Sequence, residues 1–497
     1  MSSLDAEERL LIDGELRAAE GGRSYPNRNP ATEETIGTAA DASCDDAERA
    51  VAAARRAFDD TGWSRDLAFR QHCLRQLQTA LGNTREVLRQ QIVAEVGSPL
   101  ALTYAIQMDS CIQDMSWDID VAERIEWSRE LPEHEFFGMK SLRRVLREPL
   151  GVVAAITPWN YPFMLNLSKI VPALAAGNTV VLKAAPDTPW SASWLGRIAT
   201  EHTDLPRGVL NILTAEEPAA VGDFLTADPR VDMVSFTGST AIGKRIMARG
   251  ADTLKRVFLE LGGKSAHVVL DDADLVTALQ TTVMGICTHS GQGCAINTRL
   301  LLPRSRYAEG LEILTEAMRG MRYGDPSDIA NLMGPLINAR QRDRVLGLID
   351  VGRNAGARVL VGGGRPAHLP RGFFVEPTLL ADVDPRSTVA QQEIFGPVLC
   401  VIPYDNDDDA VRIANDSRYG LSGAVSGSPE RAWNVAARLR TGTIGLNGGM
   451  WFAPDSPFGG YRESGLGREH GVEGFLEYLQ TKTVGYPAQP PPATSPA

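Results

Sequence analysis

A single thiol stands among small residues in the stretch HSGQGCAINT, which spans residues 289–298. Cys294 is flanked by Gly293 and Ala295, and these small side chains leave room for other molecules on either side of its sulfur. Sulfur is nucleophilic enough to add to a carbonyl group and is a good enough leaving group for later hydrolysis. Because a catalytic cysteine does not work alone, the rest of the chain has to supply a base and a group that stabilises negative charge.

Two other residues have side chains suited to those tasks. Glu260, in LELGGKSA (259–266), ends an apolar run before a Gly-Gly turn, where a carboxylate can serve as a general base. Asn160, in WNYPF (159–163), offers a neutral amide that can stabilise an oxyanion without protonating it. Taken singly, a surface ion pair explains Glu260 and a helix cap explains Asn160. Only their occurrence together with Cys294 indicates a catalytic site.

A strand, turn and helix pattern suited to phosphate binding occurs at FTGSTAIGKRI (236–246). A glycine turn there leads into a helix that opens with Ser239 and Thr240, and free backbone N–H groups at a helix start can hold a pyrophosphate. The stretch is not GxGxxG, so it is weak evidence by itself. Lys183, at the end of VVLK, can hydrogen-bond a ribose, although a solvated lysine at a strand end explains it equally well.

The elements that must position these residues can be predicted from the hydrophobic pattern. Residues 45–60 and about 65–125 indicate helices, and 128–148 alternate apolar and polar residues as an exposed antiparallel hairpin does. From residue 151, short β-branched runs within GVVAAITPWN, NTVVLKAA, VDMVSFTG and SAHVVLDDAD alternate with helical segments, and a second such series follows Cys294. This order predicts an α/β fold with parallel sheets covered on both faces.

Composition excludes several classes of protein. The 497 residues carry a formal net charge of -12, which disfavours binding to nucleic acid or to an anionic membrane. The six cysteines are scattered without a CxxC pair or zinc-ligand spacing, which predicts reduced thiols, no metal site and a cytoplasmic location. The N-terminus lacks the order of a signal peptide, and no apolar run reaches the roughly 18 residues of a membrane span. The proline-rich end, 487–497, is predicted to be disordered.

Taken together, the motifs resemble the aldehyde dehydrogenase superfamily from about residue 10 to 485. The matching stretches are EPLGVVAAITPWNYPF, PALAAGNTVVLKAAPDTP, FTGSTAIG, LELGGKSA, GQGC, GFFVEPTLL, QEIFGPV and PFGGYRESGLGRE. The cysteine follows the glutamate of LELGGK by 34 residues (294 minus 260), which is a highly specific spacing. Branches that pass the acyl group to coenzyme A generally lack the carboxylate at Glu260, so the resemblance implies the hydrolytic, non-acylating type.

The resemblance implies a chemical role for each catalytic residue. In such enzymes the cysteine matching Cys294 attacks an aldehyde, and the oxyanion of the thiohemiacetal lies between the Asn160 amide and the Cys294 backbone N–H. Hydride transfer to a nicotinamide ring leaves a thioester, which water deprotonated by Glu260 hydrolyses to a carboxylic acid. Glu469, in GRE, matches a carboxylate sometimes assigned to proton relay, and a structural ion pair explains it equally well.

The resemblance also implies a nicotinamide dinucleotide site. It assigns cofactor contacts to Ile156, Thr157, Pro158, Trp159, Lys183, Pro186, Gly238, Ser239, Gly243, Leu261, Gly262, Glu393 and Phe395. Lys183 matches the lysine that contacts the adenosine ribose, and Glu393 and Phe395 match residues that hold the nicotinamide ribose and ring. Pro186 stands where NAD-preferring members often carry a glutamate that repels a 2′-phosphate. We therefore favour NAD and keep NADP as the alternative.

The substrate tunnel is sketched from the same alignment. Its predicted walls are Tyr161, Leu165 and Ser168 on one side and Met450, Trp451, Phe452 and Phe458 on the other. Ser168 is small where many relatives have a bulky side chain, which hints at extra room. Mostly apolar walls with no obvious arginine at the mouth suit an apolar aliphatic or aromatic aldehyde. A dedicated semialdehyde or amino-aldehyde dehydrogenase, which needs a charged anchor, is the alternative.

Two other functional classes are less consistent with the sequence. A non-catalytic structural relative would not need the intact set of Asn160, Glu260 and Cys294. A cysteine hydrolase without nicotinamide needs a histidine base near the thiol, and His289 lies close in sequence. We interpret His289 as a loop residue, since Glu260 fills the role of base, and expect its replacement by alanine to spare most of the activity.

The family resemblance predicts how the chain divides. We expect two Rossmann-like, doubly wound domains: an NAD(P)-binding domain over 1–127 and 150–261, and a catalytic domain over 262–463. Residues 128–149 and 464–486 are predicted to form a small β element that mediates oligomerisation. Because an exposed sheet edge is a liability unless another chain covers it, a homodimer or homotetramer is expected.

Overall fold

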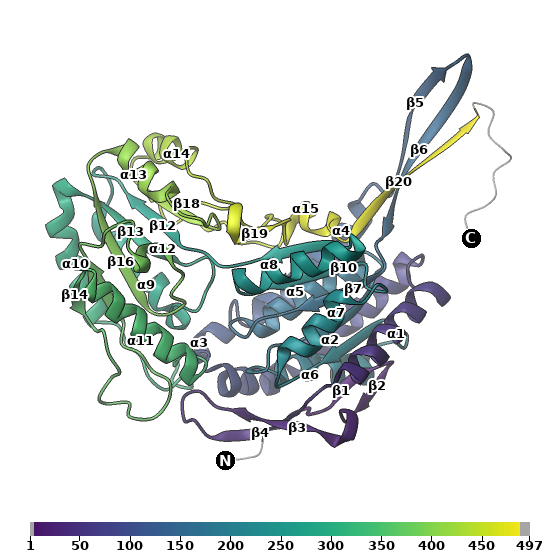
Figure 1. Cartoon of the computed structure of the whole chain (residues 1–497), viewed down its shortest axis with the longest axis horizontal. Helices are drawn as coiled ribbons and strands as arrows, with labels where there is room; N and C mark the ends of the chain where they lie inside the picture. Colours follow the sequence, from purple (N-terminus) through teal and green to yellow (C-terminus); the bar gives the residue numbers. More distant parts are fainter. Residues whose placement is uncertain (1–3, 488–497) are drawn as a thin grey trace.

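The protein is described by a computed structural model that covers residues 4–487. Its fold is α/β, with two large sheets that carry helices on both faces (Figure 1). β7 (Val152–Ile156), β8 (Thr179–Lys183) and β10 (Met233–Thr237) consist only of buried residues. Such continuous burial is what parallel strands covered by helices require, and it explains why their sequences are unbroken apolar runs. The predicted fold class is confirmed.

The first sheet has eight strands in the order β19-β11-β10-β7-β8-β9-β1-β2. The chain winds outward from β7 in both directions, so the strand order reverses between β7 and β10. The other strands are β1 (Leu10–Ile12), β2 (Glu15–Arg17), β9 (Leu210–Leu213), β11 (Arg256–Glu260) and β19 (Gly465–Leu466). Its helices are α1 (Cys44–Asp60), α2 (Leu67–Val96), α3 (Leu100–Thr103), α4 (Asp109–Arg124), α5 (Pro162–Ala175), α6 (Trp190–His202), α7 (Pro218–Ala227), α8 (Thr240–Gly250) and α15 (Gly471–Leu476).

The second sheet has seven strands in the order β14-β15-β16-β13-β12-β17-β18. They are β12 (Ser265–Val269), β13 (Asn297–Pro303), β14 (Arg358–Val361), β15 (Thr378–Ala381), β16 (Val398–Tyr404), β17 (Gly423–Ser426) and β18 (Gly445–Leu446). Its helices are α9 (Leu275–Cys287), α10 (Tyr307–Arg319), α11 (Ala339–Asn354), α12 (Thr388–Gln391), α13 (Asp407–Asn415) and α14 (Pro429–Ala436). The predicted domain boundary after residue 261 falls in the short turn between β11 and β12, and the boundaries themselves stay predictions.

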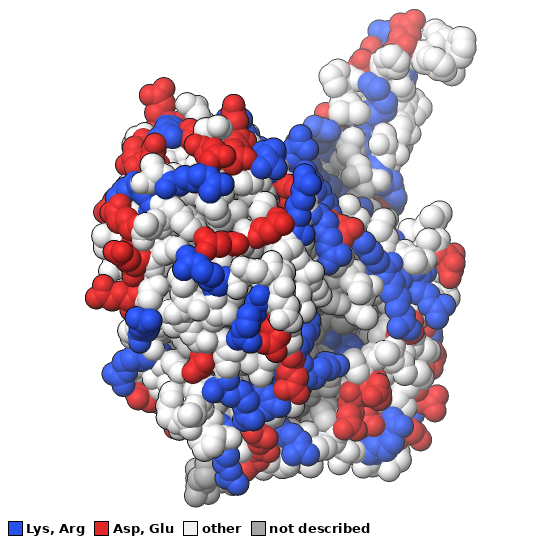
Figure 2. All heavy atoms as spheres, turned by 60° about the vertical axis from the view of Figure 1, so that its left-hand side comes forward, with Lys and Arg blue, Asp and Glu red and all other residues white. Residues whose placement is uncertain are grey.

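A three-stranded arm projects from the body of the molecule (Figures 1 and 2). The arm contains β5 (Ser128–Phe136), β6 (Met139–Pro149) and β20 (Leu479–Pro487) in the order β20-β6-β5. Outside the arm, β3 (Ser24–Arg28) and β4 (Thr35–Ala40) form a separate two-stranded sheet. Of the segment 464–486 assigned to this element, only the part from Leu479 onward joins it. The earlier part returns to the first sheet, because Phe475 is buried in that sheet's core. The predicted disordered tail lies, apart from Pro487, outside the described residues.

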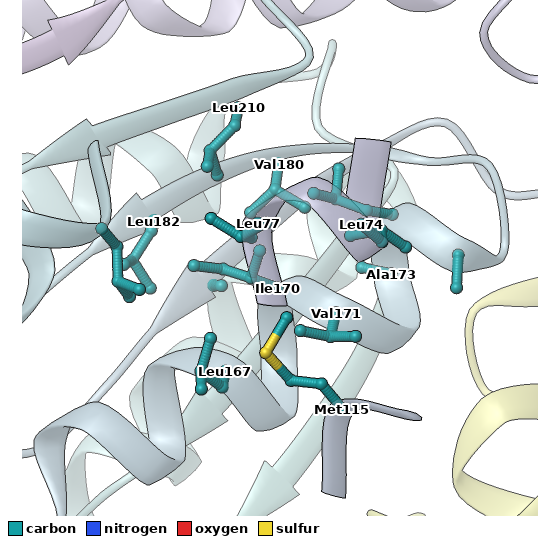
Figure 3. Packing of buried hydrophobic residues seen from close by; sticks show 14 of the residues in the cluster. Leu74, Leu77, Met115, Leu167, Ile170, Val171, Ala173, Val180, Leu182 and Leu210 are labelled. Carbon is teal, nitrogen blue, oxygen red and sulfur yellow. The ribbon is translucent and has the colours of Figure 1, made fainter. Parts of the chain in front are cut away.

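The core beneath the first sheet fixes the start of α5. Every residue from Leu165 to Ala175 is buried, because α5 lies between the sheet and the layer formed by α2 and α4 (Figure 3). Leu74 of α2 and Val180 of β8 belong to the same cluster. A helix enclosed in this way cannot shift without opening cavities, so the loop that precedes it, with Asn160, is held in place. Within residues 4–487, no helix has the length and apolar character needed to cross a bilayer.

Candidate active site

The candidate catalytic residues meet where the two sheets face each other. β11 ends at Glu260 and β12 begins at Ser265, so the chain leaves the carboxyl edge of the first sheet and enters the amino edge of the second. Asn160 follows β7 at the first edge, whereas Cys294 precedes β13 at the second. In doubly wound sheets, ligands bind at the carboxyl edge where the strand order reverses, and β7 and β10 flank that point here.

A cavity of about 820 Å³ occupies this position. Eighteen of the predicted site residues line it: Pro158, Trp159, Asn160, Tyr161, Leu165, Gly238, Ser239, Glu260, Leu261, Gly262, Cys294, Glu393, Phe395, Met450, Trp451, Phe452, Phe458 and Glu469. They come from segments that are far apart in sequence, and the structure brings them around one space.

Six predicted site residues lie outside the cavity lining. Ile156 and Gly243 pack in the first domain, where a Cβ on Gly243 would come within 2.6 Å of Leu261. Thr157 donates its hydroxyl to Asn166 at 2.7 Å, and Pro186 is half-buried after β8. The buried Lys183 donates its Nζ to the Ala184 carbonyl at 2.8 Å, and burial lowers its pKa to about 7.

Ser168, which the sequence predicted as a tunnel residue, lies outside the cavity lining. Its buried hydroxyl lies 3.2 Å from both the Leu165 carbonyl and a Glu469 carboxylate oxygen, which share its one proton, and it does not face the cavity. The extra room expected from its small side chain stays a prediction. The small side chain instead lets a hydroxyl reach the carboxylate of Glu469 from the α5 side.

The thiol of Cys294 is partly exposed to the cavity. Burial is the largest cause that raises its pKa well above the usual value, and the negative charges of Glu260, Glu393 and Glu469 raise it further. Its loop is packed closely against the turn after β11, because a Cβ on Gly263 would lie 2.4 Å from the Cys294 carbonyl oxygen. Only glycine at position 263 allows this approach, so the turn and the thiol are positioned together.

Asn160 is held by hydrogen bonds at both its backbone and its side chain. Its Nδ2 donates to the Gln292 carbonyl at 2.9 Å, while His289 Nε2 and Gln107 Nε2 lie 2.8 and 3.0 Å from its carbonyl oxygen. An asparagine amide has two N–H donors, so one remains beyond the bond to Gln292. With Asn160 lining the same cavity as Cys294, that donor is available to an oxyanion formed on the thiol's substrate.

Glu260 presents a carboxyl group without hydrogen-bond partners. The residue is 1% exposed, and neither of its oxygens is satisfied within the described part of the chain. Burial, followed by the nearby charge of Glu469, raises the pKa of Glu260 well above its usual value. A buried, unpaired carboxyl group that lines a cavity is costly to keep, and such groups mark functional sites more often than structural ones.

Glu469 forms the ion pair that the sequence left as one alternative. Its carboxylate accepts from Lys169 Nζ at 2.9 Å, and that lysine is fully buried over the Phe258 ring. The same carboxylate lines the cavity. The structural role and contact with the cavity therefore coexist in Glu469.

The residues expected to hold a nicotinamide surround one end of the cavity. Glu393 accepts a hydrogen bond from the Gly263 backbone N–H at 3.0 Å, and a Cβ on Gly262 would collide with its carboxylate at 2.4 Å. Phe395 packs edge-on against Trp159 with ring centroids 5.3 Å apart. Ser239 caps the N-terminus of α8, so this end combines a helix N-terminus, a carboxylate and two aromatic rings.

Comparison of the sequence with known protein families and proteins identifies the family of this chain. The model of the Aldehyde dehydrogenase family matches residues 17–484. A 3-succinoylsemialdehyde-pyridine dehydrogenase from a Pseudomonas species is 42% identical over 481 residues, covering 96% of this chain and 98% of the relative. The chain belongs to the aldehyde dehydrogenase family. It is an enzyme, an oxidoreductase.

Solved structures of aldehyde dehydrogenases share its fold. Betaine aldehyde dehydrogenase from Staphylococcus aureus, in complex with NAD+, superposes with a TM-score of 0.94 at 33% identity, covering 98% of this chain and 96% of that one. A mutant of aldehyde dehydrogenase C from Pseudomonas syringae, in complex with NAD+ and octanal, gives a TM-score of 0.89 at 38% identity, with 96% of each chain covered.

The aldehyde dehydrogenase cavity also contains residues that sequence reasoning missed. His470 lines it next to Glu469, with its ring 5.4 Å from that of Phe452 and its backbone at a φ of 59°. Polar residues of the second domain line a further part: His267, Asp274, Thr277, Thr281, Thr282, Asn297, Ser422, Ser426 and Asn447. Most of these lie in loops or on one face of α9, where no local pattern marks them as cavity residues.

The raised pKa of the thiol leads to a testable expectation. Because a thiolate forms only as the pH rises through its pKa, alkylation of Cys294 by iodoacetamide should keep accelerating above pH 9 in the free enzyme. Glu260→Gln removes a negative charge, so the alkylation profile should move to lower pH. Mass spectrometry of the peptide that contains Cys294 gives the rate at each pH.

The control for this experiment is Glu48→Gln, which neutralises an exposed carboxylate that pairs with Arg230 far from the thiol. It should leave the profile unchanged. Saturation of the wild-type rate below pH 8, or an identical profile for Glu260→Gln, would contradict the electrostatic account.

Proposed function

We propose that this aldehyde dehydrogenase oxidises its substrate to a carboxylic acid through a thioester on Cys294, with hydrolysis assisted by Glu260. The observation that carries the proposal is that Cys294, Asn160 and the unpaired Glu260 carboxyl line one cavity. After the thiol loses its proton to solvent, Sγ forms a bond to the aldehyde carbon and the carbonyl π electrons move to the oxygen. The oxyanion accepts a hydrogen bond from the free Nδ2–H of Asn160. When bound, NAD+ or NADP+ would accept hydride from that carbon.

Hydrolysis of the thioester is the step in which Glu260 acts. Its carboxylate accepts a proton from water, whose oxygen bonds to the thioester carbon. The C–S bond then breaks with its electron pair on sulfur, which returns Cys294 as the thiolate. Burial makes Glu260 a stronger base than an ordinary carboxylate, because the raised pKa increases its affinity for that proton. The ion pair between Glu469 and Lys169 lies close to the carboxyl group of Glu260, whose pKa both charges affect.

Expected cofactor contacts fit a nicotinamide dinucleotide. Glu393 uses one oxygen for the Gly263 N–H, which leaves the other for ribose hydroxyls, and Phe395 and Trp159 offer flat apolar surfaces. Gly238 and Ser239 bring the N-terminus of α8 to the cavity, where a pyrophosphate is stabilised. We favour NAD because the solved relatives hold it, and Pro186 leaves NADP as the alternative.

An apolar aliphatic or aromatic aldehyde fits the aromatic side of the cavity best. Trp451 and Phe458 stack with an interplanar angle of 2° and centroids 5.4 Å apart, and Phe452 packs edge-on against Phe458. One arginine, Arg344, does line the cavity, but its guanidinium donates to the backbone carbonyls of Glu393 and Ile394. The relative that binds octanal supports this substrate class.

The alternative is a dedicated semialdehyde or amino-aldehyde dehydrogenase. Asp274 and His470 line the cavity and could anchor a polar tail. The names of the Pseudomonas semialdehyde dehydrogenase and the Staphylococcus betaine aldehyde dehydrogenase support this class. Apolar and aromatic residues nevertheless dominate the wall around Tyr161, so the apolar class remains our proposal.

Glu260→Gln separates the two halves of the proposed reaction. With saturating NAD+ and hexanal, the variant should release about one NADH per active site in a burst and then turn over about 100-fold or more slower, because general-base assistance is lost. An acylated Cys294 peptide should accumulate, as detected by mass spectrometry. Cys294→Ser should abolish NADH formation, and Glu48→Gln should behave as the parent. Unchanged steady-state rates in either active-site variant would refute the mechanism.

A substrate and coenzyme panel tests the specificity. Hexanal and benzaldehyde should give a higher kcat/KM than succinate semialdehyde or an amino-aldehyde, because aromatic residues cover one side of the cavity. NAD should be preferred over NADP, and Pro186→Glu should lower the kcat/KM for NADP selectively by adding a charge that repels a 2′-phosphate. A preference of the wild type for succinate semialdehyde would show that the apolar assignment is wrong.

The projecting arm supports a proposed homodimer or homotetramer. Its tip exposes Phe136, Phe137 and Met139, of which Phe137 is 86% exposed, and an open sheet edge runs along β5. Such surfaces are normally covered by another chain. Size-exclusion chromatography with light scattering should give two or four times 53.7 kDa at micromolar concentration. Phe137→Asp should weaken the assembly, and a monomeric wild type would contradict the proposal.

We also propose a cytoplasmic location and no role for nucleic acid or membrane partners. All six cysteines are free thiols, including the exposed Cys44, as expected in a reducing compartment. Basic and acidic side chains are interspersed over the face shown in Figure 2, and the net charge of -12 disfavours polyanionic partners.

A further inference from the structure

The loop ahead of Cys294 contacts Asn160 at two points. His289 Nε2 lies 2.8 Å from the Asn160 carbonyl oxygen, and the carbonyl of Gln292 accepts the Asn160 amide at 2.9 Å. The two contacts come from residues three apart in the same short loop. This loop therefore holds both ends of the residue that we assign to the oxyanion.

The hydrogen-bonding state of His289 follows from its partner. A carbonyl oxygen only accepts, so Nε2 carries the proton and Nδ1 has a free lone pair. Nδ1 is buried and has no hydrogen-bond partner within residues 4–487. His289 is 1% exposed, and burial lowers its pKa to about 4. His289 is thus a neutral donor at neutral pH. It does not line the cavity, so it touches neither the thiol nor the space for substrate.

Backbone strain shows that the position of His289 is enforced by its surroundings. His289 and Ser290 adopt φ values of 49° and 57°, which are left-handed and unfavourable for residues with a Cβ, and Gly291 follows at 69°. At Gly291 a Cβ would lie 2.2 Å from the Gly396 carbonyl oxygen, so this turn has no space to relax.

Hydrogen bonds to the segment 332–337 of the same chain hold the strained turn in place. The His289 backbone N–H donates to the Leu332 carbonyl at 3.2 Å, and the Ser290 hydroxyl donates to the Gly334 carbonyl at 2.6 Å. The Gln292 side chain accepts from the Ile337 N–H at 2.9 Å. Strained conformations of this kind persist only where the surrounding contacts over-determine them, and they cluster at functional sites.

We propose that His289 is a positioning residue, which anchors the Asn160 carbonyl so that the free Nδ2–H of Asn160 faces the oxyanion. Gln107 shares the anchor from the α3–α4 side at 3.0 Å, but only His289 belongs to the loop that also carries the thiol. This proposal rests on the proposed oxyanion role of Asn160. It replaces the expectation, based on sequence alone, that His289→Ala spares most of the activity.

Kinetics can separate positioning from a purely structural role. His289→Ala should slow the single-turnover formation of NADH from hexanal by about 10- to 100-fold, because a misplaced donor stabilises the oxyanion poorly. Alkylation of Cys294 by iodoacetamide displaces iodide without forming an oxyanion, so its rate should stay within about twofold of the parent. His289→Asn and His289→Gln, which keep a neutral N–H donor, should recover part of the lost rate.

Two further variants complete the design. Ser290→Ala removes a hydrogen bond of the same loop but not the contact with Asn160, and it should retain the parental ratio of oxidation to alkylation. In the Asn160→Ala background, His289→Ala should cause no additional loss of the single-turnover rate, because the two residues act as one unit.

The outcomes decide between the possibilities. The positioning role is refuted if the wild type oxidises hexanal and His289→Ala matches it, if both reactions fall in parallel, or if the loss persists undiminished without Asn160. Should His289→Ala fail to fold, the asparagine and glutamine variants carry the same test, and parallel losses in both reactions refute the role. Absence of NADH formation by the wild type is a different result, which refutes the proposed function itself.

Discussion

The hydrogen bonds between Asn160 and the loop at residues 289–292 join the two halves of the molecule at the point where chemistry has to occur. Asn160 belongs to the carboxyl edge of the first sheet, and the loop leads into β13 of the second. The placement of the proposed oxyanion donor relative to the thiol therefore depends on contacts that join the two sheets. A change in how the two sheets pack would therefore move Asn160 relative to Cys294, and reactions depend steeply on such placement.

Buried carboxyl groups give this interface its electrostatic character. Glu260, Glu393 and Glu469 lie around one thiol, and among residues 4–487 only Glu469 of these three forms an ion pair, with Lys169. Burial opposes ionisation, so the pKa values of Cys294 and Glu260 are both raised. Negative charge on the proposed oxyanion would meet the neutral amide of Asn160, which lines the same cavity as the thiol. Such preorganised donors in a low-dielectric space act more strongly than they would in water.

The sequence predicted the fold class and its parallel strands, for a physical reason. Continuous apolar runs identify strands buried on both faces, and residues at their ends, such as Asn160 and Glu260, must meet at sheet edges. What it could not predict depends on loop dihedrals and on distant pairing. The left-handed turn at His289 has no periodic signal. Similarly, residues 465–466 join β11, more than 200 residues earlier in the chain, although the sequence assigned them to the arm.

The backbone joins the aromatic side of the cavity, at Phe458, to the buried carboxylate of Glu469. A change in the position of Phe458 can therefore affect the ion pair that Glu469 forms with Lys169. Phe458 and Glu469 form an antiparallel bridge, with each backbone N–H donating to the other's carbonyl at 2.7 Å. Phe458 stacks on Trp451, while the Glu469 side chain holds Lys169. A substitution that moves the 450–458 segment therefore also displaces the backbone at Glu469. Because Glu469 in turn raises the pKa of Glu260, the shape of this side of the cavity and the pKa of the Glu260 carboxyl group are physically linked.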